Sequence, residues 1–335
     1  MAETLELVWL QSGGCGGCTM SLLGADVADL VGQWRGVGIT IGWHPALSEA
    51  SGAEAIDRLD DYASGRREPG ILCVEGAMLR GPNGTGRYHA MAGTGRPMTE
   101  WVAAIAGRAR YTLAIGSCAA WGGVACAGAN LTDACGLQYE GALRGGLLGA
   151  DYRSAGGLPV VTVAGCPTHP GWVVDTLMAI GLGGYSPADL DSLQRPRLYA
   201  DQLVHHGCAR NEYYEFKASA AKPSDLGCLM ENLGCKGTQA HADCNLRSWN
   251  GEGSCTDGGY ACINCVEPGF EDPGHPFAQT PKIAGIPIGL PSDMPKAWFV
   301  ALAALSKSAT PRRVRENSRA DHLVVTPSAR RSPPK

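Results

Sequence analysis

Cysteine content constrains this chain more than any other feature, because 14 of its 335 residues are cysteine. Two CxxC pairs lie far apart, Cys15/Cys18 and Cys262/Cys265, and seven cysteines fall between positions 208 and 265. The first eleven residues show no basic segment followed by an apolar one, as a secretory signal would. We therefore expect a reducing compartment, in which clustered thiols indicate metal sites or redox chemistry rather than disulfides.

The overall composition is that of an ordinary soluble globular protein, with 44% hydrophobic residues. A net charge of −4 gives no reason to expect nucleic-acid binding. No apolar run approaches the roughly 18 residues that a membrane span needs. The best candidate, residues 297–305, is half that length and is expected to pack on a globular surface.

Short apolar runs alternate with segments of helical periodicity in the first half of the chain. The strand candidates are residues 6–10, 38–43, 71–74, 111–115 and 159–164, and the helix candidates are residues 19–31, 48–63, 98–108 and 172–180. Strands that alternate with helices pair in parallel. We predict a doubly wound α/β domain over residues 1–185.

The second half of the chain changes character, since Gly, Cys, Asn and Asp dominate and little periodicity is left. A loop-rich segment this long needs another source of order, which metal clusters can supply. We predict such a domain over residues 186–305. Residues 306–335 carry eight Lys or Arg, two acidic residues and four prolines, which predicts a flexible basic tail. Contact of this tail with a partner subunit or an anionic membrane surface stays open.

Four cysteines lie just past predicted strand ends, in glycine-rich loops. They are Cys15 and Cys18 after the first strand, Cys118 after the fourth and Cys166 after the fifth. Ligands of open α/β sheets collect outside the carboxyl ends of the strands, so loops distant in sequence can share one centre there. Four thiolates suit a 4Fe–4S cluster or a structural zinc ion.

The segments LVWLQSGGCGGCTMSLL, ILCVEGA, AIGSCAAWGG and VAGCPTHP resemble the small, electron-transferring subunit of nickel–iron hydrogenases. The resemblance leans toward the cytosolic actinobacterial and cyanobacterial uptake class. It implies a flavodoxin-like fold for the first domain and a proximal 4Fe–4S cluster held by Cys15, Cys18, Cys118 and Cys166. It also implies that the nickel–iron centre lies in a large partner subunit, because nothing in this chain matches the paired CxxC motifs that hold nickel and iron in that subunit.

A histidine and three cysteines form the next group, in HHGC and CLMENLGC. A lone histidine is usually structural, but one placed two residues outside a cysteine-rich loop fits a metal ligand. The resemblance implies a distal 4Fe–4S cluster held by His205, Cys208, Cys228 and Cys235. His206 is adjacent to the proposed ligand, and the HxxC spacing favours His205.

The family's medial cluster is usually 3Fe–4S, with three cysteine ligands that match Cys244, Cys262 and Cys265. Cys255 stands where many members of the family have proline. A fourth thiolate can retain a fourth iron, so we predict a medial 4Fe–4S cluster with Cys255 as the added ligand and a lower reduction potential. The alternative is that Cys255 is a bystander beside a 3Fe–4S centre.

Three cysteines are left over. Cys73 lies inside a predicted strand and is expected in the core, whereas Cys126 and Cys135 follow the loop of the third ligand and could approach the proximal cluster. They do not match the extra cysteines of oxygen-tolerant relatives, at whose positions this chain has Gly17 and Gly123.

One acidic residue, Glu75 of CVEGA, ends a predicted strand beside the first cluster site. It could belong to the interface with a partner subunit. It could equally cap a neighbouring helix or pair with an arginine.

The resemblance implies a relay that carries electrons from H2 oxidation in the large subunit through three iron–sulfur clusters to an acceptor, a quinone or a redox protein. The alternative is the small subunit of an H2-sensing regulatory hydrogenase. A quinone-reductase cluster subunit is disfavoured because it lacks the second cysteine-rich domain. We expect a higher oligomer of heterodimers in the cytoplasm, peripheral at the cytoplasmic face of the membrane.

Overall fold

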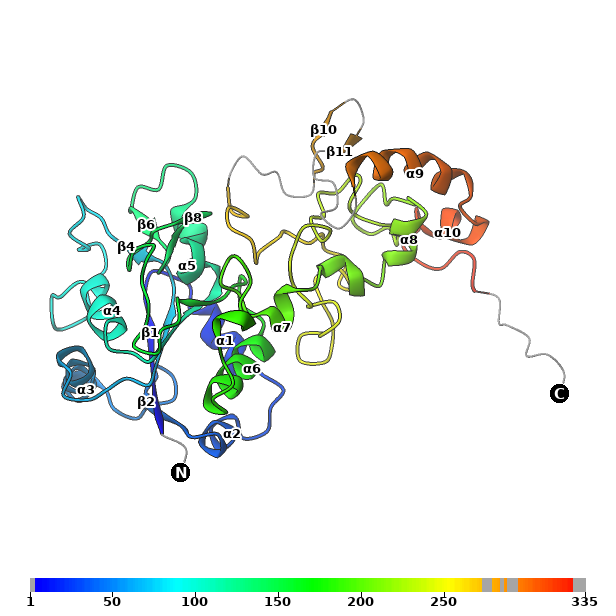
Figure 1. Cartoon of the computed structure of the whole chain (residues 1–335). Coiled ribbons are helices and arrows are strands. Elements are labelled where there is room, and N and C mark those ends of the chain that lie inside the picture. Colours follow the sequence, from blue (N-terminus) through cyan, green and yellow to red (C-terminus); the bar gives the residue numbers. More distant parts are fainter. Residues whose placement is uncertain (1–3, 273–278, 284–285, 288–294, 328–335) are drawn as a thin grey trace, which may run out of the picture. The chain divides into compact units, whose positions relative to one another are not determined.

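A computed structural model describes residues 4–272, 279–283, 286–287 and 295–327 of the chain (Figure 1). The chain divides into two compact units. Unit 1 comprises Met1–Asp201 and Cys265–His275, and unit 2 comprises Gln202–Asn264 and Pro276–Lys335. The division after Asp201 lies beyond the boundary expected at residue 185, and a short segment that begins at Cys265 belongs to unit 1.

Unit 1 is built on a five-stranded parallel sheet in the order β2-β1-β3-β5-β9. The strands are β1 (Leu5–Gln11), β2 (Ile39–Trp43), β3 (Ile71–Glu75), β5 (Tyr111–Ile115) and β9 (Val161–Val163). This strand order is that of the flavodoxin-like fold, so the predicted fold class is confirmed. Strands β3 and β5 are buried along their whole length, as expected of a sheet covered on both faces.

Helices cover both faces of the sheet (Figure 1). Helices α1 (Gly17–Leu23) and α2 (Leu30–Gly36) both contact α6 (Pro170–Gly181), whereas α3 (Gly52–Ser64) contacts α4 (Met98–Ala106). Two shorter helices, α5 (Gly116–Trp121) and α7 (Arg197–Ala200), complete the unit. In α3 the buried residues Ala55, Leu59 and Tyr62 follow helical spacing and form the face turned to the core.

The helix predicted over residues 19–31 is wrong in one respect, because α1 and α2 are separate. Helix α1 ends at Gly24. Helix α2 begins anew at Asp29, which has a φ of 52° and accepts a hydrogen bond from the backbone N–H of Gly32. A capping aspartate in the left-handed region starts a new helix and does not continue the old one.

Small elements fill the loops of unit 1. The two-stranded pairs are β4 (Met78–Leu79) with β6 (Ala134–Cys135) and β7 (Tyr139–Glu140) with β8 (Leu143–Arg144), and the 3₁₀ turns are Gly123–Cys126 and Pro187–Asp189. Cys73 in β3 and Cys135 in β6 are both fully buried. The prediction that Cys73 belongs to the core is thereby confirmed.

The described part of unit 2 has few regular elements. They are a 3₁₀ turn at Val204–Gly207, α8 (Asn211–Glu215), β10 (Lys282–Ile283) paired with β11 (Ile286–Pro287), α9 (Lys296–Ser308) and α10 (Arg312–Asn317). Two buried apolar clusters in the described part of unit 2 are small, one around Tyr213 and one around Tyr214. The unit is therefore as loop-rich as the sequence predicts.

The structure differs from the flexible tail predicted from residue 306, because α10 packs on unit 2. Val314 is fully buried against Tyr213 and Ala218, so one apolar side chain anchors an otherwise basic segment. The side-chain amide of Asn317 then exchanges two hydrogen bonds of 2.8 Å with the backbone of Val325. The last part of that tail, residues 328–335, lies outside the described residues.

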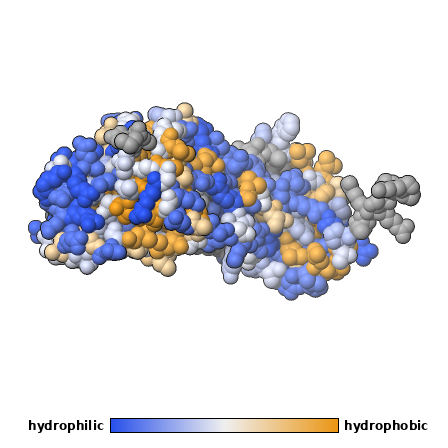
Figure 2. Space-filling view, turned by 90° about the horizontal axis from the view of Figure 1, so that it is seen from below, coloured by the Kyte–Doolittle hydropathy of each residue, from blue (hydrophilic) through white to orange (hydrophobic). Residues whose placement is uncertain are grey.

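Helix α9 contains the apolar run of residues 297–305 and leaves much of it in contact with solvent. Trp298 is 66% exposed and Leu305 is 65% exposed. In the space-filling view, apolar residues gather in patches between polar ones (Figure 2). In the residues that the structure describes, no helix is long and apolar enough to cross a membrane.

Candidate metal centres

The first candidate centre lies at the carboxyl edge of the sheet. Cys15 follows β1, Cys18 lies in the first turn of α1, Cys118 lies in α5 directly after β5, and Cys166 follows β9. The parallel sheet thus brings to one edge four cysteines from three parts of the chain.

Close packing at this edge requires glycine. A Cβ atom on Gly116 would lie 2.4 Å from the Sγ atom of Cys18, and one on Gly123 would lie 2.8 Å from the Sγ atom of Cys118. Both glycines also have a positive φ, 80° and 53°. The sulfur atoms therefore occupy space that any larger residue at these positions would fill.

The four thiols interact electrostatically. Burial, and next the neighbouring Cys166, raise the pKa of Cys118 to about 11. Burial raises the pKa of Cys18 and of Cys166, and other cysteines of the group raise both pKa values further. A metal centre must therefore displace protons from these thiols when it binds, since the thiolate is the ligand.

Backbone N–H groups point at three of the four sulfur atoms. The N–H of Gly17 lies 3.4 Å from the Sγ atom of Cys15. Those of Thr168 and Val124 donate to Cys18 and Cys118 and lower their pKa, against the larger effect of burial. Donors of this kind favour negatively charged sulfur and tune a bound cluster.

Glu75 supports the loop that carries the first two cysteines. It is 3% exposed, and its carboxylate accepts hydrogen bonds from the backbone N–H of Cys18 (2.9 Å) and of Thr19 (3.1 Å). The side chains of Trp9 and Gln11 also donate to it. Of the roles left open for Glu75, the structure therefore shows the helix cap, since these N–H groups begin α1.

Cys126 lies beside the first centre and not within the group of four. Its Sγ atom is 3.5 Å from the Oε1 atom of Glu271, and Glu271 adds to the raised pKa values of Cys118 and Cys166. Sequence reasoning missed Glu271. It lies 145 residues from Cys126, and no motif marks it.

The second candidate centre is a small cavity in unit 2 that four predicted ligands line together. His205, Cys208, Cys228 and Cys235 all face it, with Tyr214 and Met230 among the other lining residues. Burial, and less strongly Cys235 and Cys208, raise the pKa of Cys228 to about 12. We refer to this space as the distal cavity.

Backbone N–H groups again point at the sulfur atoms of the distal cavity. Arg210 donates to Cys208 at 3.4 Å, Met230 to Cys228 at 3.5 Å and Cys262 to Cys235 at 3.4 Å. The last bond joins a predicted medial ligand to a predicted distal one. Cys262 and Cys235 are thus neighbours within unit 2.

The two adjacent histidines of HHGC face different surroundings. The ring of His205 lines the distal cavity and lies 5.1 Å from the ring of Tyr214. The Nδ1 atom of His206 instead accepts a hydrogen bond from the backbone N–H of Leu203 at 3.3 Å. This arrangement favours His205 as the ligand, as the HxxC spacing does.

The predicted medial ligands are divided between the units. Cys244, Cys255 and Cys262 belong to unit 2 and Cys265 to unit 1. The loops of Cys244 and Cys255 are joined by a hydrogen bond of 2.9 Å, which the Oγ1 atom of Thr256 donates to the Oδ1 atom of Asn245. Cys255 is exposed. Ligation by these four cysteines stays a prediction.

No three His, Cys, Asp or Glu side chains of the described segments lie close enough to bind one metal ion together. A four-iron cluster uses a different iron atom for each protein ligand, so its ligands stand further apart than those of a single ion.

Comparison with known proteins identifies the family. The family described as the C-terminal part of the "NiFe/NiFeSe hydrogenase small subunit" matches residues 200–278, and the "NADH ubiquinone oxidoreductase, 20 Kd subunit" family matches residues 15–180. The "F420 non-reducing hydrogenase II small subunit" of Methanosarcina mazei is 34% identical over 91% of this chain and 83% of its own length. The chain belongs to the nickel–iron hydrogenase small subunits.

Other relatives of this small subunit agree. The "Periplasmic [NiFeSe] hydrogenase small subunit" of Desulfomicrobium baculatum is 31% identical over 82% of this chain and 87% of its own length. The solved "Actinobacterial-type NiFe-hydrogenase from Ralstonia eutropha H16" is similar in structure, with a TM-score of 0.74 at 28% identity and 93% coverage of both chains. The predicted family and the predicted hydrogenase activity as part of a complex are confirmed. Iron–sulfur clusters are expected for this family, and its small subunits pair with a large subunit.

Ser117 connects three ligand loops of the small subunit within unit 1. Its hydroxyl donates to the carbonyl oxygen of Cys265 and accepts from the backbone N–H of Gly165 at 2.9 Å. Gly165 and Ser117 precede the predicted ligands Cys166 and Cys118 directly. Sequence reasoning missed this serine because the bond to Cys265 spans 148 residues.

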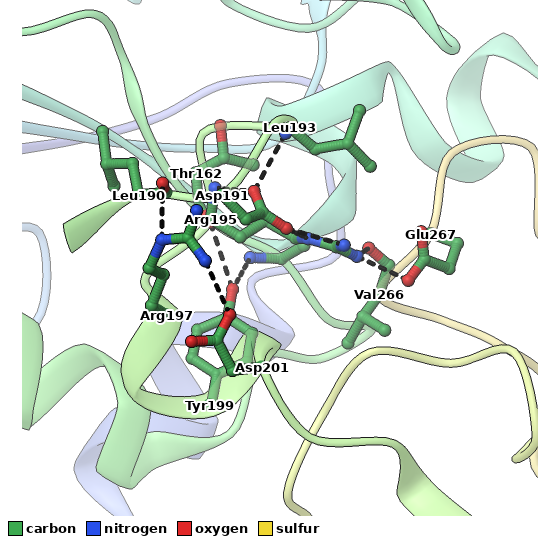
Figure 3. A network of polar contacts seen from close by, with 11 residues as sticks. Thr162, Leu190, Asp191, Leu193, Arg195, Arg197, Tyr199, Asp201, Val266 and Glu267 are labelled. Atoms are coloured by element: carbon green, nitrogen blue, oxygen red, sulfur yellow. Dashed lines mark hydrogen bonds and ion pairs between the residues drawn. The ribbon is translucent and has the colours of Figure 1, made fainter. Parts of the chain in front are cut away.

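A buried arginine anchors the segment that follows Cys265 (Figure 3). The guanidinium of Arg195, whose side chain is 3% exposed, pairs with Asp191 at 2.8 Å and with Glu267 at 2.5 Å. It also donates to the carbonyl oxygen of Val266. A buried cation between two carboxylates costs little only if both pairs form, so this network fixes the chain immediately after a predicted ligand.

Proposed function

We propose that this small subunit transfers electrons from H2 oxidation at the nickel–iron centre of its large subunit to a quinone. Proximal, medial and distal clusters would be held by the residues assigned above, with Cys255 completing a medial 4Fe–4S cluster. The observation that carries the proposal is the convergence of ligands, four cysteines at one sheet edge and His205 with three cysteines around the distal cavity.

The residues around the candidate centres fit iron–sulfur clusters. Cysteine sulfur is the usual ligand of such clusters, and the N–H groups that point at these sulfur atoms stabilise negative charge on them. When bound, the clusters supply one-electron transfer. The chain itself holds the ligand loops, through Glu75, Ser117 and Arg195.

A hydrogen bond supports the proposal that the medial and distal clusters are neighbours in the relay. The backbone N–H of Cys262, a predicted medial ligand, donates to the Sγ atom of Cys235, a predicted distal ligand. Electron transfer weakens steeply with distance, and contact between ligand shells keeps the distance short.

The main experiment is purification of the chain with its large subunit, followed by H2-dependent reduction of a viologen dye. We expect the two subunits to purify together and the dye to be reduced. Cys118→Ser should lower the rate by at least about tenfold because it removes a proximal ligand. Cys126→Ser is the matched control, since that thiol lies beside the group of four, and it should keep the rate. Equal loss in both variants would contradict the ligand assignment.

The medial assignment has its own test. The oxidised wild-type protein should show no paramagnetic signal of a 3Fe cluster, whereas Cys255→Ser should show one. Ser254→Ala is the control. A 3Fe signal in the wild-type protein would make Cys255 a bystander.

The same preparation separates the relay from the H2-sensing alternative. A histidine kinase that purifies with the complex, together with negligible dye reduction under H2, would favour the sensor. We propose the relay because the distal cavity lies beside a second cavity suited to an acceptor, described below.

We further propose that the complex is a higher oligomer of heterodimers that works in the cytoplasm, peripheral at the cytoplasmic face of the membrane. The excess of basic residues after position 306 supports attraction to anionic lipid. Cell fractionation in low and high salt tests this proposal. Complex that stays in the soluble fraction at low salt would contradict the peripheral location.

A further inference from the structure

Unit 2 contains a cavity of about 280 Å³ beside α9. Its walls come from α8 and the residues after it, from the loop that carries Cys228, from β11 and from one face of α9. The lining residues that matter here are Tyr214, Lys217, Cys228, Met230, Ala303 and Lys307. We call this space the α9 cavity.

The α9 cavity is apolar inside and polar at one end. Met230, Val300 and Ala303 are among its apolar lining residues. At the polar end, the Nζ atom of Lys307 pairs with Glu231 at 2.8 Å. Pockets that bind small molecules are mostly apolar with a few placed polar groups, and begin at about 300 Å³, so this cavity suits a single ring system.

Only a thin wall separates the α9 cavity from the distal cavity. Tyr214, Cys228 and Met230 line both spaces. Tyr214 and Met230 are buried together, with the predicted ligands Cys228 and Cys235 packed against them. A molecule in the α9 cavity would therefore contact the residues that surround the distal cluster.

A cation is placed to interact with such a molecule. The Nζ atom of Lys217 lies 3.8 Å from the centre of the Tyr214 ring and lines the α9 cavity. An ammonium group can donate a hydrogen bond to a carbonyl oxygen and stabilise the negative charge that arrives with an electron.

We propose that the α9 cavity binds the ring of the quinone that accepts electrons from the distal cluster, an assignment that rests on the function proposed above. H2 gives two electrons and two protons at the large subunit. The quinone takes the two electrons singly across the wall of Cys228, Tyr214 and Met230. It takes two protons from water at the polar end and leaves as the hydroquinone. Lys217 donates to one quinone carbonyl oxygen.

Two alanines of α9 give a matched pair of variants. Ala303 lines the cavity, whereas Ala301 is exposed and does not. In the complex with the large subunit, Ala303→Trp should fill the cavity and raise the KM for a short-chain quinone at least about tenfold. Ala301→Trp should leave this KM unchanged. Both variants should reduce a viologen dye with H2 at the wild-type rate, because the dye does not need the cavity.

A milder pair of variants covers the case in which Ala303→Trp disturbs the fold. Ala304→Leu narrows the same cavity, and Lys217→Met removes the donor. Each should raise the KM for the quinone several-fold. A benzoquinone and a naphthoquinone with equal side chains show which ring the cavity prefers.

Two results would overturn the assignment of the α9 cavity. They are an unchanged quinone KM in both Ala303→Trp and Ala304→Leu, and an equal rise in Ala301→Trp. A wild-type complex that reduces dye but no quinone, or one that reduces neither, would instead contradict the proposed function. In that case, equilibrium dialysis of the oxidised quinone against wild-type and Ala303→Trp complexes tests the cavity, and equal binding overturns it.

Discussion

The strands of unit 1 bury side chains that belong to no candidate centre, such as Leu7, Val8 and Trp9 of β1. Its predicted cluster ligands stand at the edge of that core. In the described part of unit 2, two apolar clusters are small, and one of them consists of Tyr214 and Met230 with two predicted ligands packed against them. A sheet can therefore position ligands before metal arrives, whereas a loop-rich unit needs the metal to complete its core.

Iron removal should have the largest effect, and it separates the units directly. When a chelator strips iron from the complex under reducing conditions, amides of unit 2 should lose protection from hydrogen exchange by at least about a hundredfold. Amides of β1 and β3 should keep theirs. Equal losses in both units would break the comparison, because the sheet would then depend on metal as well.

The buried ion network of unit 1 should give the next largest effect. Arg195→Met leaves Asp191 and Glu267 without their cation in a buried setting, which should cost about 3–5 kcal/mol of unfolding free energy. Arg197→Ala is the control, because the Arg197–Asp201 pair is about half exposed on both sides and should contribute under about 1 kcal/mol. Hydrogen exchange in β5 and β9 measures both variants. Similar losses would show that burial does not decide the strength of these pairs.

The same contrast explains what the sequence could and could not predict. Apolar runs alternate with helical segments in unit 1, and that pattern alone places Cys118 and Cys166 past strand ends. The split between α1 and α2 was missed because Asp29 caps through a backbone angle that no periodicity encodes. Ser117 and Glu271 were missed because their partners lie more than a hundred residues away.

In unit 2 the sequence predicts the ligand residues better than it predicts the three-dimensional structure around them. The HxxC spacing and the cysteines that follow it indicate which residues line the distal cavity. The α9 cavity could not be predicted, because its walls come from segments that only the fold brings together. Val314 anchors α10, but as one apolar residue in a basic stretch it belongs to no sequence pattern that would predict this packing.

A substitution at Glu75 should show that hydrogen bonds of unit 1, and not metal, position the loop that carries Cys15 and Cys18. Glu75→Ala leaves several donors without an acceptor, among them the backbone N–H groups of Cys18 and Thr19, and should cost about 2–3 kcal/mol. The loss of protection should be greatest at the start of α1. Glu54→Ala in α3 is the control, since that carboxylate is 70% exposed and pairs only with Arg58 among its described contacts, a contribution of about 0.5 kcal/mol. Loss of the proximal cluster with no change in exchange at α1 would assign Glu75 to the metal instead.

The smallest effect is a pH dependence confined to unit 1. Burial lowers the pKa of His44 to about 4, against an opposing effect of Glu75. The folded state therefore binds fewer protons than the unfolded state between about pH 4 and pH 6.5. The contribution of His44 to the free energy of unfolding is fully present above the pKa that His44 has in the unfolded chain. It decreases as the pH falls, by about 2 kcal/mol at pH 5.

Exchange of β1 amides at pH 7 and pH 5, corrected for the intrinsic rate, measures the His44 effect. His44→Gln should remove most of the difference, because glutamine has no proton to gain. His322→Gln should leave it unchanged, since the side chain of His322 is 74% exposed and lies in unit 2. A wild-type difference that survives in His44→Gln would assign the pH dependence to another group. We expect no such pH dependence for the amides of unit 2. The contrast would then be complete, because only the unit with a preformed core would lose stability when a buried neutral histidine becomes protonated.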